Sequence, residues 1–386
     1  MTYRFFVLSV PHTVTRPEYS TCAFTMKVLK LCKMLKMRDH TVLHLGHEDS
    51  IVDCDEHVTV TTQADLEASY PGHDWRTQGF PDFKLTDPIY AIHTANAVAA
   101  IKARQQPGDF LLCPWGAGNK PVADNVSDLI VCESGIGYAG GTFAPYKVYE
   151  SYAVMHGLYG AQRVGSMFTD AWYDCVIPNA FDPDDFTFSA EKHDYLLFLG
   201  RVGPGKGTNI AVQIAEATGH RLIVAGPGRV QQADARTDRP IDEYVTHLGV
   251  VGPEMRAGLL ARAKAVLCPS TYLEPFCGVM IEAALSGTPV ISTDWGAFAE
   301  NLLHGVTGFR CRTFEHFTFA VRNIDRIDPR DCRVWAAANF SLERVAAMYD
   351  EYFDNVAKIY GGRGGWYAEN AERQNLDWLK RTVPGG

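Results

Sequence analysis

The segment Tyr195–Gly219, YLLFLGRVGPGKGTNIAVQIAEATG, joins an apolar strand, a glycine-rich turn and an amphipathic helix in immediate succession. Apolar residues recur at helical spacing after Gly207, whereas the residues before Gly200 form one short apolar run. The turn between them carries two cations, Arg201 and Lys206. Strand, turn and helix in this order form the repeating unit of parallel, doubly wound sheets, so the segment predicts an α/β fold.

The residues that follow repeat this alternation. Strands are expected at 221–226, 246–251, 265–270 and 288–294, and helices at 253–264 and 297–305. Short connections between such elements place neighbouring strands in one parallel sheet. We therefore expect a complete doubly wound domain over residues 183–350.

The first half of the chain shows the same alternation less regularly. Strands are expected at 4–10, 40–46, 109–116 and 128–134, and helices at 21–38, 88–106 and 145–160. This predicts a separate domain over residues 1–182, which ends in the connector IPNAFDPDDF at 177–186. A helix is expected from Ser341 to about Lys358, and residues 351–386 are expected to form a helical segment that crosses back to the first domain.

Composition is typical of a large soluble enzyme. The 386 residues are enough for two hydrophobic cores. The formal net charge of −9, without a run of basic residues, makes nucleic acid an unlikely partner but leaves room for a local basic cleft. The ten cysteines include no Cys-x-x-Cys pair, which favours free thiols in a reducing cytoplasm. No apolar stretch approaches the length of a transmembrane helix.

The segment EPFCGVMIE, Glu274–Glu282, carries two carboxylates eight positions apart. This spacing predicts that both lie on one helix, Glu274 at its mouth and Glu282 on roughly the same side, about 12 Å further along the axis. Backbone N–H groups at a helix start have no intrahelical acceptor and favour an anion. Carboxylates that hold hydroxyls beside amides that hold phosphate indicate a site for a nucleotide-activated sugar; the amides are those of Phe276, Cys277, Gly278 and Val279.

Taken together and in this order, the segments resemble the C-terminal half of retaining glycosyltransferases of family 4, strongly over about residues 176–345 and weakly before them. The resemblance implies the GT-B fold, in which two Rossmann-like doubly wound domains face each other across a cleft. It implies a retaining hexosyltransferase that takes a nucleoside-diphosphate sugar, UDP- or GDP-linked, and needs neither cofactor nor metal. The acidic runs at 53–55 and 182–185 lie away from the expected phosphate turn, so we do not assign them a metal.

The resemblance also assigns roles to the residues of the second domain. Arg201 and Lys206, with Gly200 beside them, would stabilise the departing diphosphate. Glu282 would hold the ribose hydroxyls, and Glu274 would hold the transferred sugar. The turn at Gly226 faces the donor in the family, although a glycine there is equally explained as a simple turn. The backbone of Val251 would contact the nucleotide base.

The acceptor side is predicted less sharply because the first half lacks the family's paired-glycine loop after the first strand. Glu133 and Ser134 follow a strand at the edge where ligands gather on parallel sheets. His156 is the nearest histidine, but an ordinary packed helix histidine explains it equally well.

The predicted function is transfer of a sugar to a hydroxyl acceptor. The alternatives are a GT-B nucleotide-sugar epimerase or phosphorylase, or a non-catalytic protein that binds sugar nucleotides or glycans. Acceptor, sugar, nucleotide and oligomeric state are not determined by the sequence, because such loops vary freely on one scaffold.

Overall fold

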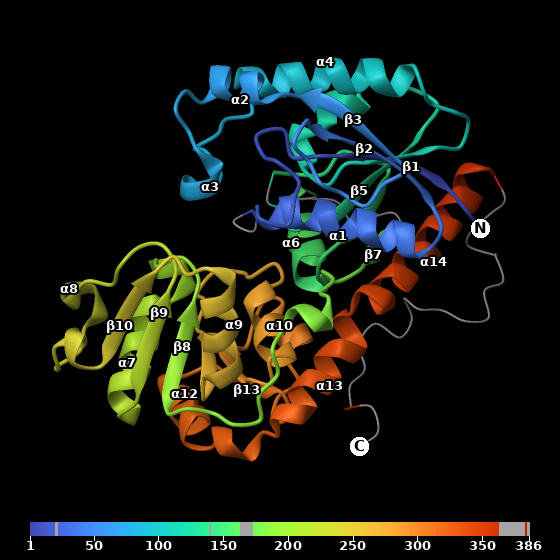
Figure 1. Ribbon diagram of the computed structural model, residues 1–386. Coiled ribbons are helices and arrows are strands. Elements are labelled where there is room, and N and C mark those ends of the chain that lie inside the picture. The colour runs from blue at the N-terminus through green and yellow to red at the C-terminus, as the bar shows by residue number, and fades with distance from the viewer. Residues whose placement is uncertain (20–21, 139, 163–172, 363–382, 384–386) are drawn as a thin grey trace. The chain divides into compact units, whose positions relative to one another are not determined.

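A computed structural model describes residues 1–19, 22–138, 140–162, 173–362 and 383. The chain divides into two compact units, and each contains one of the sheets in Figure 1. The first unit comprises the described residues of Met1–Glu150 and Met155–Ala180 together with helix α14 (Leu342–Tyr360). The second comprises Ser151–Val154 and Phe181–Ser341. Apart from the short stretch 151–154, the divisions fall after residues 180 and 341, whereas the sequence predicts them after 182 and 350.

The sheet of the first unit is parallel throughout, in the order β3-β2-β1-β4-β5-β6-β7. Its strands are β1 (Arg4–Leu8), β2 (Thr41–His47), β3 (Glu56–Thr61), β4 (Phe110–Leu112), β5 (Ile130–Ile136), β6 (Tyr146–Tyr149) and β7 (Cys175–Val176). The helices along this part of the chain are α1 (Ala23–Met37), α2 (Gln63–Ser69), α3 (Trp75–Gln78), α4 (Pro88–Lys102), α5 (Lys120–Ala123) and α6 (Tyr152–Gln162).

Side-chain alternation along β1 explains how helices cover both faces of this sheet. Phe6 and Leu8 belong to the same buried cluster as Ile101 of α4. Phe5 points to the other face, where its ring lies 4.7 Å from that of Phe353 on α14. Successive strand residues face opposite sides, so a strand buried on both faces is apolar at every position.

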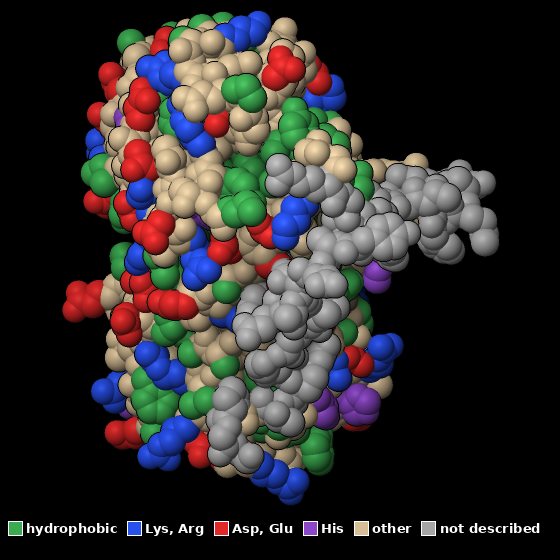
Figure 2. All heavy atoms as spheres, turned by 90° about the vertical axis from the view of Figure 1, so that its right-hand side faces the viewer, with side chains coloured by type: hydrophobic (Ala, Val, Ile, Leu, Met, Phe, Trp, Pro, Cys, Tyr) green, Lys and Arg blue, Asp and Glu red, His purple; other side chains and the backbone are tan. Residues whose placement is uncertain are grey.

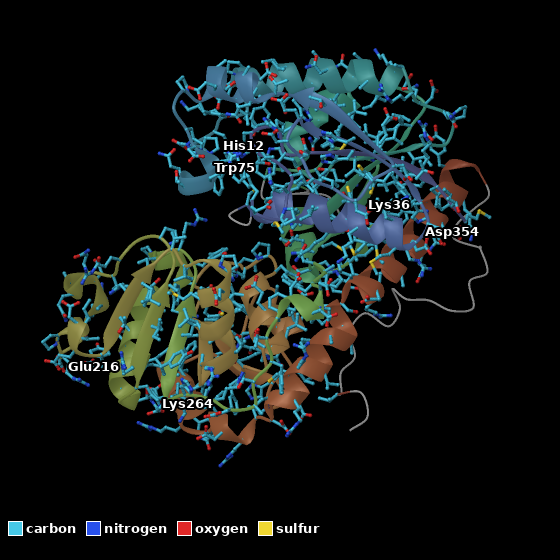
Figure 3. All side chains as sticks on the ribbon, viewed as in Figure 1. His12, Lys36, Trp75, Glu216, Lys264 and Asp354 are labelled. Carbon is cyan, nitrogen blue, oxygen red and sulfur yellow. The ribbon has the colours of Figure 1, made fainter. Side chains whose placement is uncertain are left out.

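Helix α14 confirms the helix predicted from residue 341 and belongs to the first unit. Arg38 donates from Nη2 to Asp350 Oδ2 at 2.7 Å. The hydroxyl of Tyr3 donates to Asp354 on the same helix at 2.8 Å; Figure 3 labels Asp354. Polar contacts and the Phe353 packing together explain why the last described helix folds onto the first strand. Most of the predicted segment 351–386 lies outside the described residues.

The prediction of one helix over 145–160 is wrong in its first part. Residues Tyr146–Tyr149 form β6, which pairs in parallel with β5 in the register Cys132↔Tyr146. The helix α6 begins only at Tyr152. Alternating Tyr and Val side chains fit a buried pleated strand better than a helix, and the apolar run alone does not distinguish the two.

The second unit also contains a parallel sheet, in the order β10-β9-β8-β11-β12-β13. Its strands are β8 (Tyr195–Leu199), β9 (Arg221–Ala225), β10 (Val245–Gly249), β11 (Ala265–Cys268), β12 (Val290–Thr293) and β13 (Gly308–Cys311). Its helices are α7 (Thr208–Thr218), α8 (Gln232–Ala235), α9 (Pro253–Arg262), α10 (Gly278–Leu285), α11 (Phe298–Asn301), α12 (Phe314–Arg322) and α13 (Pro329–Phe340). The predicted strand and helix order of this half is confirmed.

The described surface carries mixed charge. On the face drawn in Figure 2, Lys and Arg side chains lie among Asp and Glu side chains. Among the described helices, none has the length and apolar character needed to cross a membrane.

Candidate functional site

The candidate site lies in the second unit, where the ends of four parallel strands bring their following loops to one edge of the sheet. Gly200 follows β8, Gly226 follows β9, the loop with Glu274 follows β11, and Gly296 follows β12. Ligands of doubly wound sheets bind at this carboxyl-terminal edge.

Glycines allow these loops to approach one another closely. A Cβ on Gly226 would lie 2.1 Å from the carbonyl oxygen of Gly200. Gly207 has φ of +69°, and a Cβ there would lie 2.0 Å from the carbonyl oxygen of Pro269. The packing of the β8 turn against its neighbours therefore explains both glycines without a ligand.

Lys206 and Glu274 form the centre of the site. The Lys206 ammonium donates to the two carboxylate oxygens of Glu274 at 2.8 and 3.1 Å, and to the hydroxyl of Tyr272 at 2.7 Å. Glu274 is only 4% exposed, whereas the Lys206 side chain is 32% exposed, so the carboxylate is removed from water and the ammonium is not. Burial lowers the pKa of Lys206, but the charge of Glu274 and its hydrogen bonds outweigh burial and raise the pKa overall. Lys206 is thus a fixed cation at neutral pH.

The backbone around Glu274 is held by the loop after β12. Gly296 has φ of +58°, and a Cβ there would lie 2.9 Å from both N and O of Glu274. The amide of Ala297 donates to the Glu274 carbonyl at 3.0 Å. Two neighbouring loops therefore fix Glu274, one through its side chain and one through its backbone.

The expectation that Glu274 and Glu282 share one helix is wrong. Helix α10 begins at Gly278, and Glu274 lies in the loop before it. Pro275 disfavours helical backbone at the preceding residue. Cys277 has φ of +68°, a left-handed conformation that a helix does not contain. The separation expected along a common helix axis therefore does not apply.

Glu282, which lies on α10, is paired with a cation that the sequence does not single out. Arg256 of α9 donates from Nε to Glu282 Oε2 at 3.1 Å and also contacts this oxygen through Nη2. Arg256 is in the first turn of α9, which begins at Pro253. The sequence does show Arg256 on the helix predicted at 253–264, but no spacing rule predicts that it contacts Glu282.

The residues at the start of α10 differ in their surroundings. Phe276 is 2% exposed and packs parallel to Phe181 at 6.2 Å. Cys277 lies 4.0 Å from Cys268, sulfur to sulfur, and this contact together with burial raises the pKa of its thiol well above the usual range. The amide of Met280 donates back to the Cys277 carbonyl at 3.1 Å. Gly278 and Val279 are the first two residues of α10.

Arg201 and Val251 lie at the edge of the site. Arg201 is exposed in the turn after β8 and has no hydrogen bond or ion pair with another described residue. Val251 follows β10, two residues beyond Gly249, which has φ of +66°. The structure therefore brings Lys206, Glu274 and Tyr272 into contact, whereas Arg201 remains unengaged.

The three residues predicted for the acceptor side lie elsewhere in the chain: Glu133 and Ser134 on β5, and His156 on α6. Glu133 on β5 is fully buried and accepts from Tyr138 Oη at 2.6 Å and from the amides of Phe143 and Ala144 at 2.8 and 2.9 Å. Burial raises the pKa of Glu133, although these hydrogen bonds oppose the rise. The Glu133 carboxylate thus stabilises the connection between β5 and β6 by binding Tyr138, Phe143 and Ala144.

Ser134 and His156 have different environments. Ser134 is 3% exposed, and its hydroxyl has no partner among the described residues. His156 lies on the exposed side of α6.

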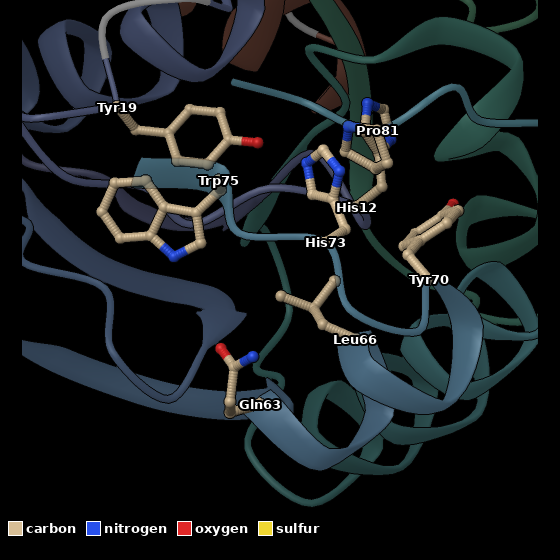
Figure 4. A pocket seen from close by; sticks show the side chains of 8 residues that line it. All are labelled: His12, Tyr19, Gln63, Leu66, Tyr70, His73, Trp75 and Pro81. Atoms are coloured by element: carbon tan, nitrogen blue, oxygen red, sulfur yellow. The ribbon is translucent and has the colours of Figure 1, made fainter. Parts of the chain in front are cut away.

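A small cavity in the first unit is lined by aromatic and histidine side chains (Figure 4). Its volume of about 10 Å³ is enough for roughly one water molecule. The His12 ring stacks on the Phe83 ring with 3.9 Å between their centres, and His12 Nδ1 is hydrogen-bonded to the Tyr90 hydroxyl at 2.8 Å. Burial lowers the pKa of His12 to about 3. The cavity is too small for a sugar, so we treat these residues as packing. Within the described ranges no group of three or more His, Cys, Asp and Glu side chains is arranged to hold a metal.

Comparison with known proteins finds a family match that lies within the second unit. Residues 193–324 match the family described as glycosyl transferases group 1. The D-inositol 3-phosphate glycosyltransferase of Nocardia farcinica is 31% identical in an alignment 210 residues long that covers 48% of this chain. The aligned region spans 46% of that relative, so the chain spans less than half the length of this curated relative.

Two solved structures share the fold over nearly their whole length. AviGT4, a glycosyltransferase involved in avilamycin A biosynthesis, has a TM-score of 0.66 at 22% identity over 92% of this chain and 98% of its own. HepE from Anabaena, solved with UDP and glucose, has a TM-score of 0.64 at 15% sequence identity, and the match covers 91% of this chain and 99% of HepE. Residues 193–324 thus match the group 1 glycosyl transferases, and the chain that carries them has the GT-B fold.

Proposed function

We propose that this chain transfers a sugar from a nucleoside-diphosphate sugar to a hydroxyl acceptor, with retention of configuration and without a metal. The observation that carries the proposal is the ion pair of Lys206 with the buried carboxylate of Glu274, which lies at the carboxyl-terminal edge of the second sheet and is fixed by loops after three strands. A neutralised pair at a ligand-binding edge offers one group for an anion and one for hydroxyls.

In this proposal Lys206 turns from Glu274 to the diphosphate, and Glu274 accepts hydrogen bonds from the transferred sugar. Charge on the leaving phosphate grows as the glycosidic bond breaks, so a fixed ammonium stabilises the transition state more than the ground state. Arg201 is unengaged in the present structure and exposed, and it is free to add a second, bidentate contact.

Glu282 is assigned to the ribose hydroxyls, with Arg256 as the group that orients its carboxylate. The acceptor hydroxyl attacks the anomeric carbon from the face that the diphosphate leaves, and its proton passes to the departing phosphate oxygen. The protein needs no carboxylate nucleophile for this route. The complex of HepE with UDP and glucose supports a uridine donor among the candidates.

Metal independence is tested by assaying donor cleavage and transfer in excess EDTA. We expect activity to persist, because Lys206 and the start of α10 supply the positive potential that a divalent ion would supply. Loss of activity that Mg²⁺ or Mn²⁺ restores would contradict this part of the proposal.

The same assay separates the alternatives. A transferase releases nucleoside diphosphate and forms a new glycoside, an epimerase returns an isomeric nucleotide sugar, and a phosphorylase requires inorganic phosphate. A non-catalytic binding protein would bind the donor and leave it intact.

A further inference from the structure

We propose that Tyr272 is a positioning residue of the donor site, which holds the ammonium of Lys206 while that ammonium moves from Glu274 to the donor. This inference rests on the proposed function and adds a residue that neither the sequence patterns nor the family assignment of roles singled out.

The hydroxyl of Tyr272 completes the coordination of Lys206. An ammonium has three N–H donors. Lys206 directs hydrogen bonds to Tyr272 Oη at 2.7 Å and to both oxygens of Glu274. The centre of the Tyr272 ring also lies 5.0 Å from the Lys206 nitrogen, within the range of a cation–π contact.

The backbone beside Tyr272 is attached to the turn that carries Lys206. The amide of Thr271 donates to the carbonyl of Gly205 at 2.9 Å, and its hydroxyl donates to the carbonyl of Pro204 at 3.2 Å. A Cβ at Gly205 would meet the Tyr272 ring at an ordinary contact distance of 3.6 Å. The backbone beside Tyr272 is therefore attached to the Lys206 turn by contacts that do not involve Glu274.

Tyr272 also borders solvent, unlike Glu274. Its side chain is 38% exposed, whereas Glu274 is 4% exposed. Burial, followed by a hydrogen bond to Glu274, raises the pKa of Tyr272 to about 12, so the phenol is neutral at any ordinary assay pH. A neutral hydroxyl can accept a hydrogen bond from Lys206 and still leave the positive charge of the ammonium available to a phosphate.

These contacts predict a particular order of events. A diphosphate replaces the two bonds from Lys206 to Glu274, and the bond to Tyr272 remains and limits where the ammonium can go. Removal of the hydroxyl leaves Lys206 charged but less well placed for the departing phosphate. Loss of one hydrogen bond from the Lys206 ammonium to a partly exposed phenol hydroxyl should have about a 3- to 10-fold effect, which should fall mainly on kcat.

The test is Tyr272→Phe, with Tyr195→Phe as the matched control. Tyr195 is also in the second unit, but it lies at the start of β8 and its hydroxyl donates to the carbonyl of Leu259 at 2.8 Å. The donor is whichever of UDP-glucose, GDP-mannose and ADP-glucose raises the melting temperature of the wild-type chain most. Release of nucleoside diphosphate from that donor gives kcat and KM, and thermal unfolding gives stability.

We expect Tyr272→Phe to lower kcat about 3- to 10-fold, to leave KM within about 2-fold, and to leave the melting temperature unchanged. Tyr195→Phe should do the reverse, lowering the melting temperature with little change in kcat. Unchanged kinetics in Tyr272→Phe, or equal losses of stability and kcat in both variants, would overturn the role of Tyr272 while the active wild type upholds the proposed function. A wild-type chain that neither binds nor cleaves any of the three donors would overturn both.

Discussion

At the scale of single residues, each glutamate of the candidate site is neutralised by a cation from a different element. Lys206 comes from the turn after β8 and Arg256 from α9. A donor that uses these glutamates must compete with their present partners. Ligand affinity therefore depends on the strength of the internal pairs as well as on contacts with the ligand.

Glu274→Gln should strengthen binding of a free nucleoside diphosphate, about 3- to 10-fold, although it weakens sugar transfer. The substitution keeps the shape of the side chain but removes the charge that competes with phosphate for Lys206. Calorimetric titration with UDP, GDP and ADP measures the first effect, and initial rates measure the second. Weaker binding of the diphosphate would show that Glu274 contacts the nucleotide itself.

Glu282→Gln provides the contrast, because its carboxylate is assigned to the ribose. Loss of charge-assisted hydrogen bonds worth roughly 1.5–3 kcal/mol should weaken the same diphosphate about 10- to 150-fold. Glu254→Gln, an exposed carboxylate on α9, is the matched control and should change affinity less than about 2-fold. Opposite signs for Glu274 and Glu282 are the signature of the proposed assignment.

At the scale of elements, the site can form only if glycine-containing turns allow the loops after the strands to pack closely against one another. Gly207 joins the turn after β8 to α7 with φ of +69° and has no room for a Cβ beside Pro269. The site therefore depends on backbone packing between loops as much as on its charged side chains.

Gly207→Ala should destabilise the second unit by about 1–3 kcal/mol and reduce donor binding, because both the left-handed backbone and the contact with Pro269 oppose a Cβ. Gly258→Ala is the control. Gly258 lies within α9, where a Cβ would meet no neighbouring atom within 4 Å, so alanine should stabilise the helix by about 0.5–1 kcal/mol. Thermal unfolding of both variants compares the two; equal melting temperatures would contradict the packing account.

Element order was predictable from the sequence, but the contacts between elements were not. Apolar runs and glycine turns identified the strands of the second unit because its inner strands, such as β11 and β12, are buried on both faces. The start of α10 was misplaced because the left-handed backbone of Cys277 leaves no mark in the apolar pattern. Tyr272 and Arg256 were missed because their roles come from residues of other loops and helices.

At the scale of the whole molecule, the buried histidines of the first unit should make folding sensitive to acid. Burial lowers the pKa of His44 to about 3 and that of His93 to about 4. His44 Nδ1 lies 3.0 Å from His57 Nδ1, so the two imidazole rings would repel each other if both were protonated. Such histidines are neutral in the folded chain, whereas the unfolded chain protonates them below about pH 6.5.

Because the folded pKa values lie below the unfolded one, the unfolded state binds more protons as the pH falls. Stability is fully present above about pH 6.5 and should be lost between there and about pH 4, with a slope of up to about 1.4 kcal/mol per pH unit for each histidine. Urea unfolding from about pH 8 to about pH 5 measures this slope. His93→Gln should remove about one histidine's share, and an unchanged slope would contradict the assignment.

The central claim is that Lys206 stabilises the departing diphosphate, and steady-state kinetics of Lys206→Ala test it most directly. With the nucleotide sugar that best stabilises the wild type, kcat should fall about 100-fold or more while KM rises less than about 10-fold. This result would place the main interaction of Lys206 in the transition state. A normal kcat with only a raised KM would contradict the account and make Lys206 a simple anchor for the bound nucleotide.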